Sequence, residues 1–342
     1  MTVDADLPER LLRVLRTVTG MRALAYARPP QVLTGGFWAE LLALSLTDPP
    51  EGWPRELVAR VMPDPGLARK ETVVQAAVAA AGYPTPVVRA SGGPDSGLGR
   101  AFMVMDRAPG APLLSGLSGA GAIAGAVRVA GQLPEILASS MAALHALDPH
   151  CIREQLRNSG DVPTTVAGLL DALRDAAASY QRVDLADAAR WLIAHPAPPA
   201  PEVVCHGDLH PFNLLADGEQ VTVVDWSAAL LAPRAHDVAV TTLLLAEPPL
   251  HVPGPLRPLL RAAGRLLASR FARHYREHTN ATIGARELHW HQAVVSLRAL
   301  VEVAGWVHSG IISERRGHPW LITGPALTAR LNAITGASAR AR

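Results

Sequence analysis

The feature that most constrains the fold of this sequence is a reversal of the chain at residues 217–220. The four residues there read Asp-Gly-Glu-Gln, and a short apolar run flanks them on each side. An Asp-Gly step between apolar runs is a strong signal for a β-hairpin. Pairing about a midpoint at Glu219 sets Asn213 opposite Asp225, and directly opposed side chains in a hairpin lie roughly 5 Å apart. We therefore expect both side chains to reach one cation.

These side chains carry the chemistry of a metal and phosphoryl-transfer site. The amide oxygen of Asn213 and a carboxylate oxygen of Asp225 form a hard ligand set that suits Mg²⁺, which completes its shell with water and substrate phosphates. A third oxygen-bearing side chain, Asp208, lies five residues before Asn213. Phosphoryl transfer requires mainly that phosphate, metal and hydroxyl are held in line while charge is neutralised. Three converging side chains of this kind can hold the three groups in this way.

Length and composition predict a large globular protein. The 342 residues are 49% hydrophobic and only 18% charged, which allows a large core and suggests two domains or one two-lobed unit. No apolar run approaches the roughly 18 residues needed to cross a bilayer, and the N-terminus opens acidic. We expect a soluble, cytoplasmic protein with no membrane partner. Cys151 and Cys205 favour buried thiols over a disulfide framework, and no zinc-binding spacing is present.

The basic residues are distributed unevenly. Lys70 is the only lysine, so any role that lysine usually fills falls to arginine or is absent. From Ala229 onward the sequence holds 14 arginines against six acidic residues, although the net charge of the whole chain is only +2. A nucleic-acid-binding module is one interpretation of this region. The arginines recur at helical spacing without interleaved aromatic residues, so we favour solvated helix faces and expect no nucleic-acid partner.

Hydrophobic periodicity predicts strands in the first third of the chain and helices after it. An amphipathic helix is predicted first, at 7–27. The predicted strands are 41–46, 56–62, 86–89 and 101–105, with a helix at 67–81 and a long turn at 90–99. The later predicted helices are 120–147, 164–194, 255–279, 284–309 and 321–335. The chain is therefore expected to be an α+β protein with a small β-rich lobe followed by a larger α-helical lobe.

The residues around Asp208 resemble a known family. His206-Gly207-Asp208 with Asn213 five residues after the aspartate, followed by the Val-Val-Asp-Trp of 223–226, is similar to the catalytic and metal loops of aminoglycoside phosphotransferase-like kinases. The resemblance covers residues 31–310 and implies the bilobal fold of protein kinases. After the N-terminal helix that periodicity indicates, assigned to 1–30, it implies a nucleotide-binding N-lobe at 31–108 and a C-lobe at 109–342 with the catalytic loop and the acceptor-binding helices.

The resemblance also implies roles for the three oxygen-bearing side chains. Asp208 would orient and deprotonate the acceptor hydroxyl, while Asn213 and Asp225 would hold Mg²⁺ on the nucleotide phosphates.

Three neighbouring residues are expected to stay outside the chemistry. His206 is expected to be buried and structural, and His210 to face solvent. Asp237 matches a family aspartate that begins a helix and supports the catalytic loop, a position that the helix dipole also favours.

The phosphate-binding half of the site is less strongly marked. Gly35 and Gly36 resemble the family's glycine turn, where absent Cβ atoms let the backbone approach the phosphates. Arg60 lies on the strand that normally carries a phosphate-binding lysine, and Glu71 matches the helix acid that pairs with that lysine. A guanidinium can bridge a carboxylate and a phosphate, so ATP binding is expected despite the replacement.

Residues 101–110 resemble the last strand of the small lobe and the hinge that follows it. By this likeness the Asp106 carbonyl and the Ala108 amide pair with the adenine edge, and Met105 lines the back of the pocket.

The sequence thus predicts an ATP- and Mg²⁺-dependent phosphotransferase that acts on a hydroxyl of a small molecule. The arginine-rich C-terminal region favours a neutral or anionic acceptor, either an antibiotic or a metabolite, with Glu287 and Glu302 as candidates to meet a cation. The alternative is a pseudokinase or nucleotide-binding regulator, which the replaced lysine supports and the intact set of Asp208, Asn213 and Asp225 opposes. Oligomeric state and the choice between ATP and GTP stay open.

Overall fold

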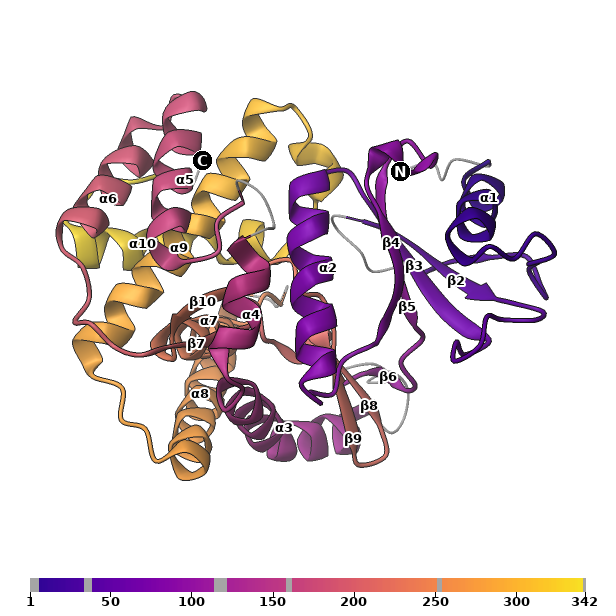
Figure 1. Ribbon diagram of the computed structural model, residues 1–342. Coiled ribbons are helices and arrows are strands. Elements are labelled where there is room, and N and C mark those ends of the chain that lie inside the picture. The colour runs from indigo at the N-terminus through magenta and orange to yellow at the C-terminus, as the bar shows by residue number, and fades with distance from the viewer. Residues whose placement is uncertain (1–5, 34–38, 114–121, 158–161, 251–253, 341–342) are drawn as a thin grey trace. The chain divides into compact units, whose positions relative to one another are not determined.

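The computed structural model describes residues 6–33, 39–113, 122–157, 162–250 and 254–340. They divide into two compact units. The first unit comprises Met1–Ala111, His150–Val162 and Leu215–Ser227. The second unit comprises Pro112–Pro149, Pro163–Leu214 and Ala228–Arg342. A sheet formed early in the chain and a predominance of helices later confirm the predicted α+β fold (Figure 1).

The first unit is built on a five-stranded antiparallel sheet in the order β1-β2-β3-β5-β4. Its strands are β1 (Gln31–Leu33), β2 (Glu40–Ser45), β3 (Glu56–Met62), β4 (Val88–Gly92) and β5 (Ala101–Asp106). Strand β4 begins two residues later than predicted, because Pro86 has no N–H to give to a ladder. It also extends into the predicted turn at 90–99, which is completed by a 3₁₀ helix, η1 (Pro94–Ser96).

One helix covers each face of this sheet (Figure 1). Leu57, Ala59 and Val61 of β3 pack in one core with α1 (Leu7–Thr19). The alternate residues of β3 face α2 (Pro65–Ala80), because successive side chains of a strand point to opposite faces. Helix α1 ends at Thr19 and not at the predicted residue 27, because Gly20 takes a left-handed φ of 71° there.

The predicted hairpin at 217–220 is confirmed. Strands β8 (Leu214–Asp217) and β9 (Gln220–Val223) are joined by two residues and form a three-stranded sheet with β6 (Ala111–Pro112). Helix α4 (Pro149–Arg157) completes the first unit; the periodicity of the sequence did not predict it.

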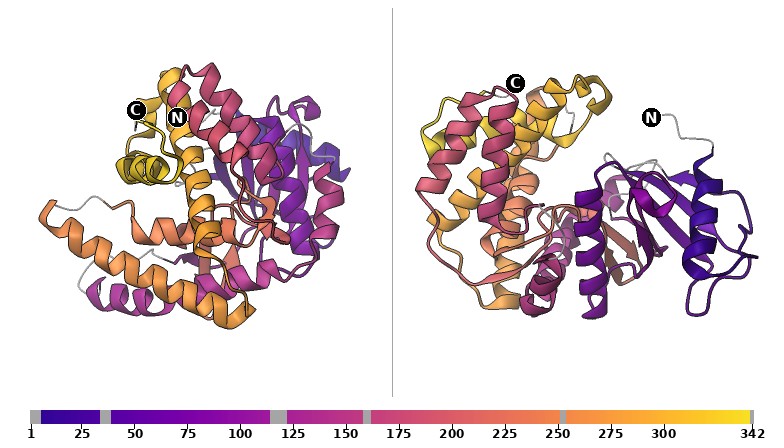
Figure 2. Two further views of the ribbon diagram at one scale, coloured as in Figure 1. Left: turned by 90° about the vertical axis from the view of Figure 1, so that its left-hand side faces the viewer. Right: turned by 45° about the horizontal axis from the view of Figure 1, so that its top comes forward.

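The described part of the second unit is mainly helical (Figure 2), and it contains an antiparallel strand pair, β7 (Glu202–Cys205) and β10 (Leu230–Pro233). Its helices are α3 (Ala122–His145), α5 (Val166–Ser179), α6 (Val183–Ala194), α7 (Ala235–Ala246), α8 (Arg257–Thr279), α9 (Ala285–His308) and α10 (Pro319–Thr335), with the 3₁₀ turns η2 (Pro211–Asn213), η3 (Gly254–Leu256) and η4 (Ile312–Arg315). The predicted helix at 164–194 is two helices, because Gln181 takes a left-handed φ of 60°.

Within the described residues, no helix is both long and apolar enough to cross a lipid bilayer.

Candidate active site

The loop that carries Asp208 leaves the end of β7 beside the start of β10. Cys205 pairs with Leu230 across the two strands, so the chain turns sharply at His206 and Gly207. Gly207 has a φ of 74°, and a Cβ at this position would lie 2.2 Å from the carbonyl oxygen of Ala228. Only glycine fits, because any side chain would collide with fixed backbone.

A buried carboxylate holds this loop from behind. Asp237 lies in the first turn of α7 and accepts hydrogen bonds from the backbone N–H groups of His206 at 2.8 Å and Gly207 at 2.7 Å. Burial raises the pKa of the Asp237 carboxyl, but a hydrogen bond from His145 and the neighbouring histidines lower it below its usual range. The prediction that Asp237 begins a helix and supports the loop is confirmed, as is the burial of His206.

Asp208 is an ionised carboxylate that is partly exposed to solvent. Its side chain is 26% exposed, and its Oδ2 lies 3.5 Å from Nε2 of His210. Arg298 of α9 donates to the Gly207 carbonyl at 3.0 Å. Burial raises the pKa of the Asp208 carboxyl, but His210, Arg298 and His206 together lower it well below its usual range. Asp208 is therefore ionised at neutral pH.

The expectation that His210 faces solvent is met only in part. Its side chain is 22% exposed and lies against Asp208. The ring also accepts a hydrogen bond from the Phe212 N–H at 3.2 Å, because His210 caps the N-terminus of η2. This second bond fixes the ring that neighbours the Asp208 carboxylate.

Asn213 and Asp225 lie outside the hairpin strands that were expected to pair them. Asn213 ends η2, and Asp225 follows β9 by two residues with a left-handed φ of 67°. The hairpin is centred between Gly218 and Glu219, so the expected pairing about Glu219 is wrong. Asn213 donates from Nδ2 to the Asp208 carbonyl at 2.9 Å, which leaves its amide oxygen as the group that can ligate a cation.

In the first unit, one guanidinium lies between two carboxylates. Arg60 points from β3 toward α2, with its Nε 3.2 Å from Oε1 of Glu71 and its Nη2 3.1 Å from Oδ1 of Asp225. Arg60 and Glu71 are 8% and 2% exposed, whereas Asp225 is 31% exposed. Ser227 donates to the same Asp225 oxygen at 2.7 Å. The sequence-based pairing of Arg60 with Glu71 is present, and Asp225 joins it.

Burial and the neighbouring charges shift the pKa values of both Glu71 and Arg60. Burial raises the pKa of Glu71 to about 7, because the attraction of Arg60 only partly offsets the loss of water and Asp225 adds repulsion. Burial acts to lower the pKa of Arg60, but the two carboxylates raise it above its usual value. Arg60 is therefore always charged, while Glu71 takes up a proton near neutral pH.

The predicted adenine-binding residues lie at the end of β5. Met105 is buried between the sheet and α2, and Gln75 donates to its sulfur at 3.1 Å. Asp106 ends the strand in a two-point ion pair with Arg89, at 2.6 and 2.8 Å. Among the described residues, the Ala108 N–H has no hydrogen-bond acceptor. The predicted glycine turn, Gly35 and Gly36, lies outside the described residues.

Sequence reasoning missed Arg298 and Ser227. Arg298 lies 91 residues after Gly207, whose carbonyl it holds, so no local pattern links them. Ser227 follows Asp225 by two residues. Its hydrogen bond to the Asp225 carboxylate depends on the left-handed backbone conformation of Asp225, which the sequence does not predict.

Solved structures similar to this chain are phosphotransferases. One is a protein of Ralstonia eutropha provisionally described as an aminoglycoside phosphotransferase (18% identity, 95% of this chain and 98% of that chain covered, TM-score 0.62). A second is an aminoglycoside phosphotransferase in ternary complex with ADP and hygromycin B (18%, 95% and 98%, 0.57). A third is a macrolide 2'-phosphotransferase of type I (16%, 92% and 97%, 0.56). At these identities the likeness shows the fold alone, and it confirms the predicted kinase-like architecture.

The family assignment comes from the sequence itself. No protein of curated function matches the chain. The model of the phosphotransferase enzyme family matches residues 46–277, which is 232 of the 342 residues. That range includes Arg60, Asp208 and Asp225. The chain therefore belongs to the phosphotransferase enzyme family and is a small-molecule phosphotransferase.

Proposed function

We propose that this enzyme transfers the γ-phosphate of ATP, with Mg²⁺, to a hydroxyl group of a small molecule. The observation that carries the proposal is the state of Asp208, whose carboxylate is ionised and partly exposed to solvent. Hydrogen bonds from the loop backbone to Asp237 and from Arg298 to the loop backbone hold this residue in place. A carboxylate so held can orient an acceptor hydroxyl and accept its proton as the O–P bond forms.

Asn213 and Asp225 are proposed as the Mg²⁺ ligands. Their donor chemistry fits the ion, because an amide oxygen and a carboxylate oxygen are the hard ligands that Mg²⁺ takes from proteins while it keeps water and phosphate oxygens. Bound there, the metal would neutralise negative charge on the phosphates. The contact of Asp225 with Arg60 and Ser227 holds its carboxylate in one orientation.

The first unit is proposed to bind the nucleotide. Arg60 would hold phosphate oxygens while Glu71 orients its guanidinium, and Gly35 and Gly36 would cover the phosphates. The adenine edge would pair with the Asp106 carbonyl and the Ala108 N–H. The ADP complex of a similar structure supports a nucleotide in this fold. In this proposal residues 31–108 form the nucleotide-binding lobe and residues 109–342 carry the catalytic loop and acceptor site.

The acceptor is proposed to be a small hydroxyl compound, an antibiotic or a metabolite. The similar structures support this size class, since their names refer to aminoglycosides, hygromycin B and macrolides. The arginine excess after Ala229 favours a neutral or anionic acceptor over a polycation.

The test is ADP release with Mg·ATP and a panel of aminoglycosides, macrolides, sugars, amino alcohols and hydroxy acids. Wild type is expected to release ADP with one class above its acceptor-free rate, and Asp208→Asn is expected to release ADP at least about 100-fold more slowly. Robust turnover of kanamycin would contradict the charge argument.

A regulator that binds nucleotide without turnover is the second candidate, favoured by the arginine at position 60. It predicts Mg·ATP binding with no ADP release in either wild type or Asp208→Asn.

A further inference from the structure

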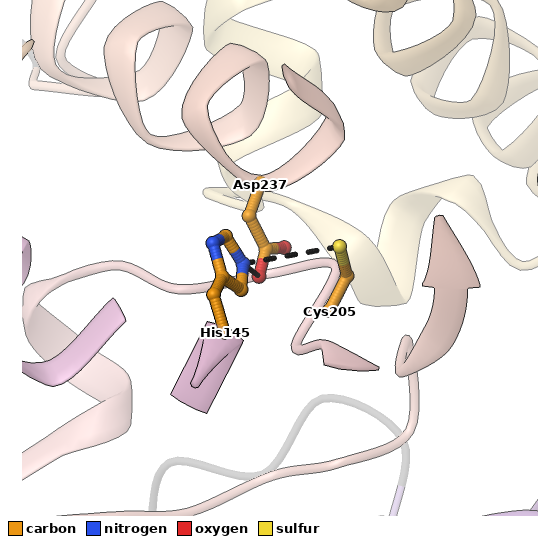
Figure 3. A group of neighbouring side chains, drawn as sticks. All are labelled: His145, Cys205 and Asp237. Atoms are coloured by element: carbon orange, nitrogen blue, oxygen red, sulfur yellow. Dashed lines mark hydrogen bonds and ion pairs between the residues drawn. The ribbon is translucent and has the colours of Figure 1, made fainter. Parts of the chain in front are cut away.

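Three hydrogen-bond donors converge on one buried carboxylate behind the catalytic loop. Besides the His206 and Gly207 N–H groups, Asp237 lies against the imidazole of His145, with Nε2 3.1 Å from Oδ2. His145 is the last residue of α3, so this contact ties that helix to the loop (Figure 3). The side chains of His145 and Asp237 are fully buried.

The thiol of Cys205 completes the group drawn in Figure 3, at 3.9 Å from His145 Nε2. His, Cys and Asp side chains this close are also a set that can ligate a metal ion. Here the nitrogen atoms of His145 and both oxygens of Asp237 already have hydrogen-bond partners in the protein. The group is therefore satisfied as a hydrogen-bonded network.

The direction of each hydrogen bond in this network can be worked out from the Asp237 end. An ionised carboxylate can only accept hydrogen bonds, so Nε2 of His145, which lies 3.1 Å from Oδ2, is the donor of that bond. In neutral His145 the other nitrogen, Nδ1, then offers a lone pair, and the Tyr275 hydroxyl at 2.6 Å can donate to it.

An imidazole nitrogen that accepts a hydrogen bond carries no proton. With Nδ1 accepting from Tyr275, neutral His145 has its proton on Nε2, which is the nitrogen that faces Asp237. The opposite tautomer would direct a nitrogen lone pair at the carboxylate, which repels it strongly in a fully buried site.

We propose that Tyr275 and His145 are positioning residues for phosphoryl transfer: Tyr275 donates to Nδ1 and fixes the ring of the Nε2-protonated His145, and His145 thereby holds Asp237 and the backbone that aims Asp208. The proposal rests on the proposed role of Asp208 in the reaction. It extends the support of the catalytic loop from α7 to α3 and α8, which carry His145 and Tyr275.

The contact with His145 restricts the orientation of the Asp237 carboxylate more than the two loop amides do by themselves. The two loop amides take one oxygen each, Gly207 on Oδ1 and His206 on Oδ2, so the carboxylate could still tilt about its own bond. The contact of His145 with Oδ2 adds a third fixed point. Because reacting atoms must be held within fractions of an ångström, a small tilt of the loop is costly to rate.

The tautomer is measured by ¹⁵N NMR of histidine-labelled protein at pH 7.5, with His145→Gln used to assign the signal. Wild type is expected to show a protonated Nε2 and an unprotonated Nδ1 at His145. In Tyr275→Phe the proton is expected to stay on Nε2, and the Nδ1 signal is expected to shift because that nitrogen loses its hydrogen bond. Tyr26→Phe is the matched control, because it also removes a tyrosine hydroxyl that donates a hydrogen bond, to the Pro8 carbonyl at 2.8 Å, but in the first unit. A proton on Nδ1 in wild type, or an Nδ1 signal that is unchanged in Tyr275→Phe, overturns the proposal.

The second measurement is ADP release at saturating Mg·ATP, corrected for the folded fraction. His145→Leu fills the volume without a donor and is expected to lower kcat about 10–100-fold, with the Kd for Mg·ADP unchanged within about twofold. His145→Gln keeps a donor near the place of Nε2 and is expected to recover most of the rate. Equal rates in the Leu and Gln variants would mean a packing role only. If wild type itself releases no ADP, the proposed function fails, and the NMR result still decides the tautomer.

Discussion

Replacing Glu71 by glutamine is expected to stabilise the protein at alkaline pH and to change its stability little at acidic pH. Glu71 is 2% exposed, and burial raises its pKa from 4.5 to about 7. A group whose folded pKa lies above its unfolded pKa contributes stability that is complete below the unfolded value and is lost as pH rises through the folded value. The stability that protonated Glu71 provides is therefore lost between pH 4.5 and pH 7.

The size of the effect follows from the same two values. Their difference of about 2.5, at 1.36 kcal/mol for each pKa unit, corresponds to about 3 kcal/mol of unfolding free energy at pH 8 and less than about 1 kcal/mol at pH 5. Glutamine keeps the shape and hydrogen-bonding capacity of protonated Glu71 but cannot ionise. The variant should therefore exceed wild type in stability by about 3 kcal/mol at pH 8 only.

Urea unfolding at pH 5 and pH 8, followed by tryptophan fluorescence and circular dichroism, measures this difference. Glu56→Gln is the matched control, since Glu56 also pairs with an arginine, Arg28, but lies on β3 and is 40% exposed. Its substitution should change the unfolding free energy by less than about 1 kcal/mol at either pH. A Glu71→Gln variant that is no more stable than wild type at pH 8 would refute the account of the buried charges around Arg60.

Three further outcomes are expected. Gly207→Ala should lose at least about 2 kcal/mol of stability, measured by thermal unfolding, because its φ of 74° and the approach to the Ala228 oxygen at 2.2 Å exclude a Cβ; a melting temperature equal to that of wild type contradicts this. Asp208→Asn should bind Mg·ATP with unchanged affinity in calorimetry and lose at least about 100-fold in ADP release, and the lowered pKa of Asp208 means that wild-type turnover shows no loss from its protonation between pH 6 and pH 8. Asn213→Ala and Asp225→Ala should each raise the Mg²⁺ concentration needed for half-maximal ADP release, and unchanged metal titrations would remove them as ligands.

The parts of the site predicted from sequence are those encoded by adjacent residues. His206, Gly207 and Asp208 follow a strand directly, and the Asp-Gly step closes the hairpin, so local pattern was sufficient for both. The expected pairing of Asn213 with Asp225 failed because both residues leave the extended conformation, one in η2 and the other in a left-handed turn. The prediction extended the regular hydrogen-bond ladder of the hairpin to Asn213 and Asp225, where the backbone is irregular.

Long-range contacts could not be predicted. Periodicity did not predict helix α7, which only the family resemblance at Asp237 indicated, because Ala235–Leu245 are all buried and no polar face gives the segment a helical period. The contact of His210 with Asp208 was not predicted, because a half-buried histidine beside a carboxylate has no signature in sequence. His145 and Tyr275 lie 92 and 38 residues from Asp237 in the chain, and only the packing of α3 and α8 brings them to it.

The carboxylate of Asp237 also determines how the catalytic loop can open. Irregular segments normally exchange their amide hydrogens with solvent first, because little is lost when they detach. The His206 and Gly207 N–H groups lie outside any helix or strand, yet their release would leave an ionised, buried carboxylate without two of its donors. Their deuterium exchange should therefore be as slow as that of the surrounding helices. This irregular turn should accordingly be one of the last parts of the second unit to unfold.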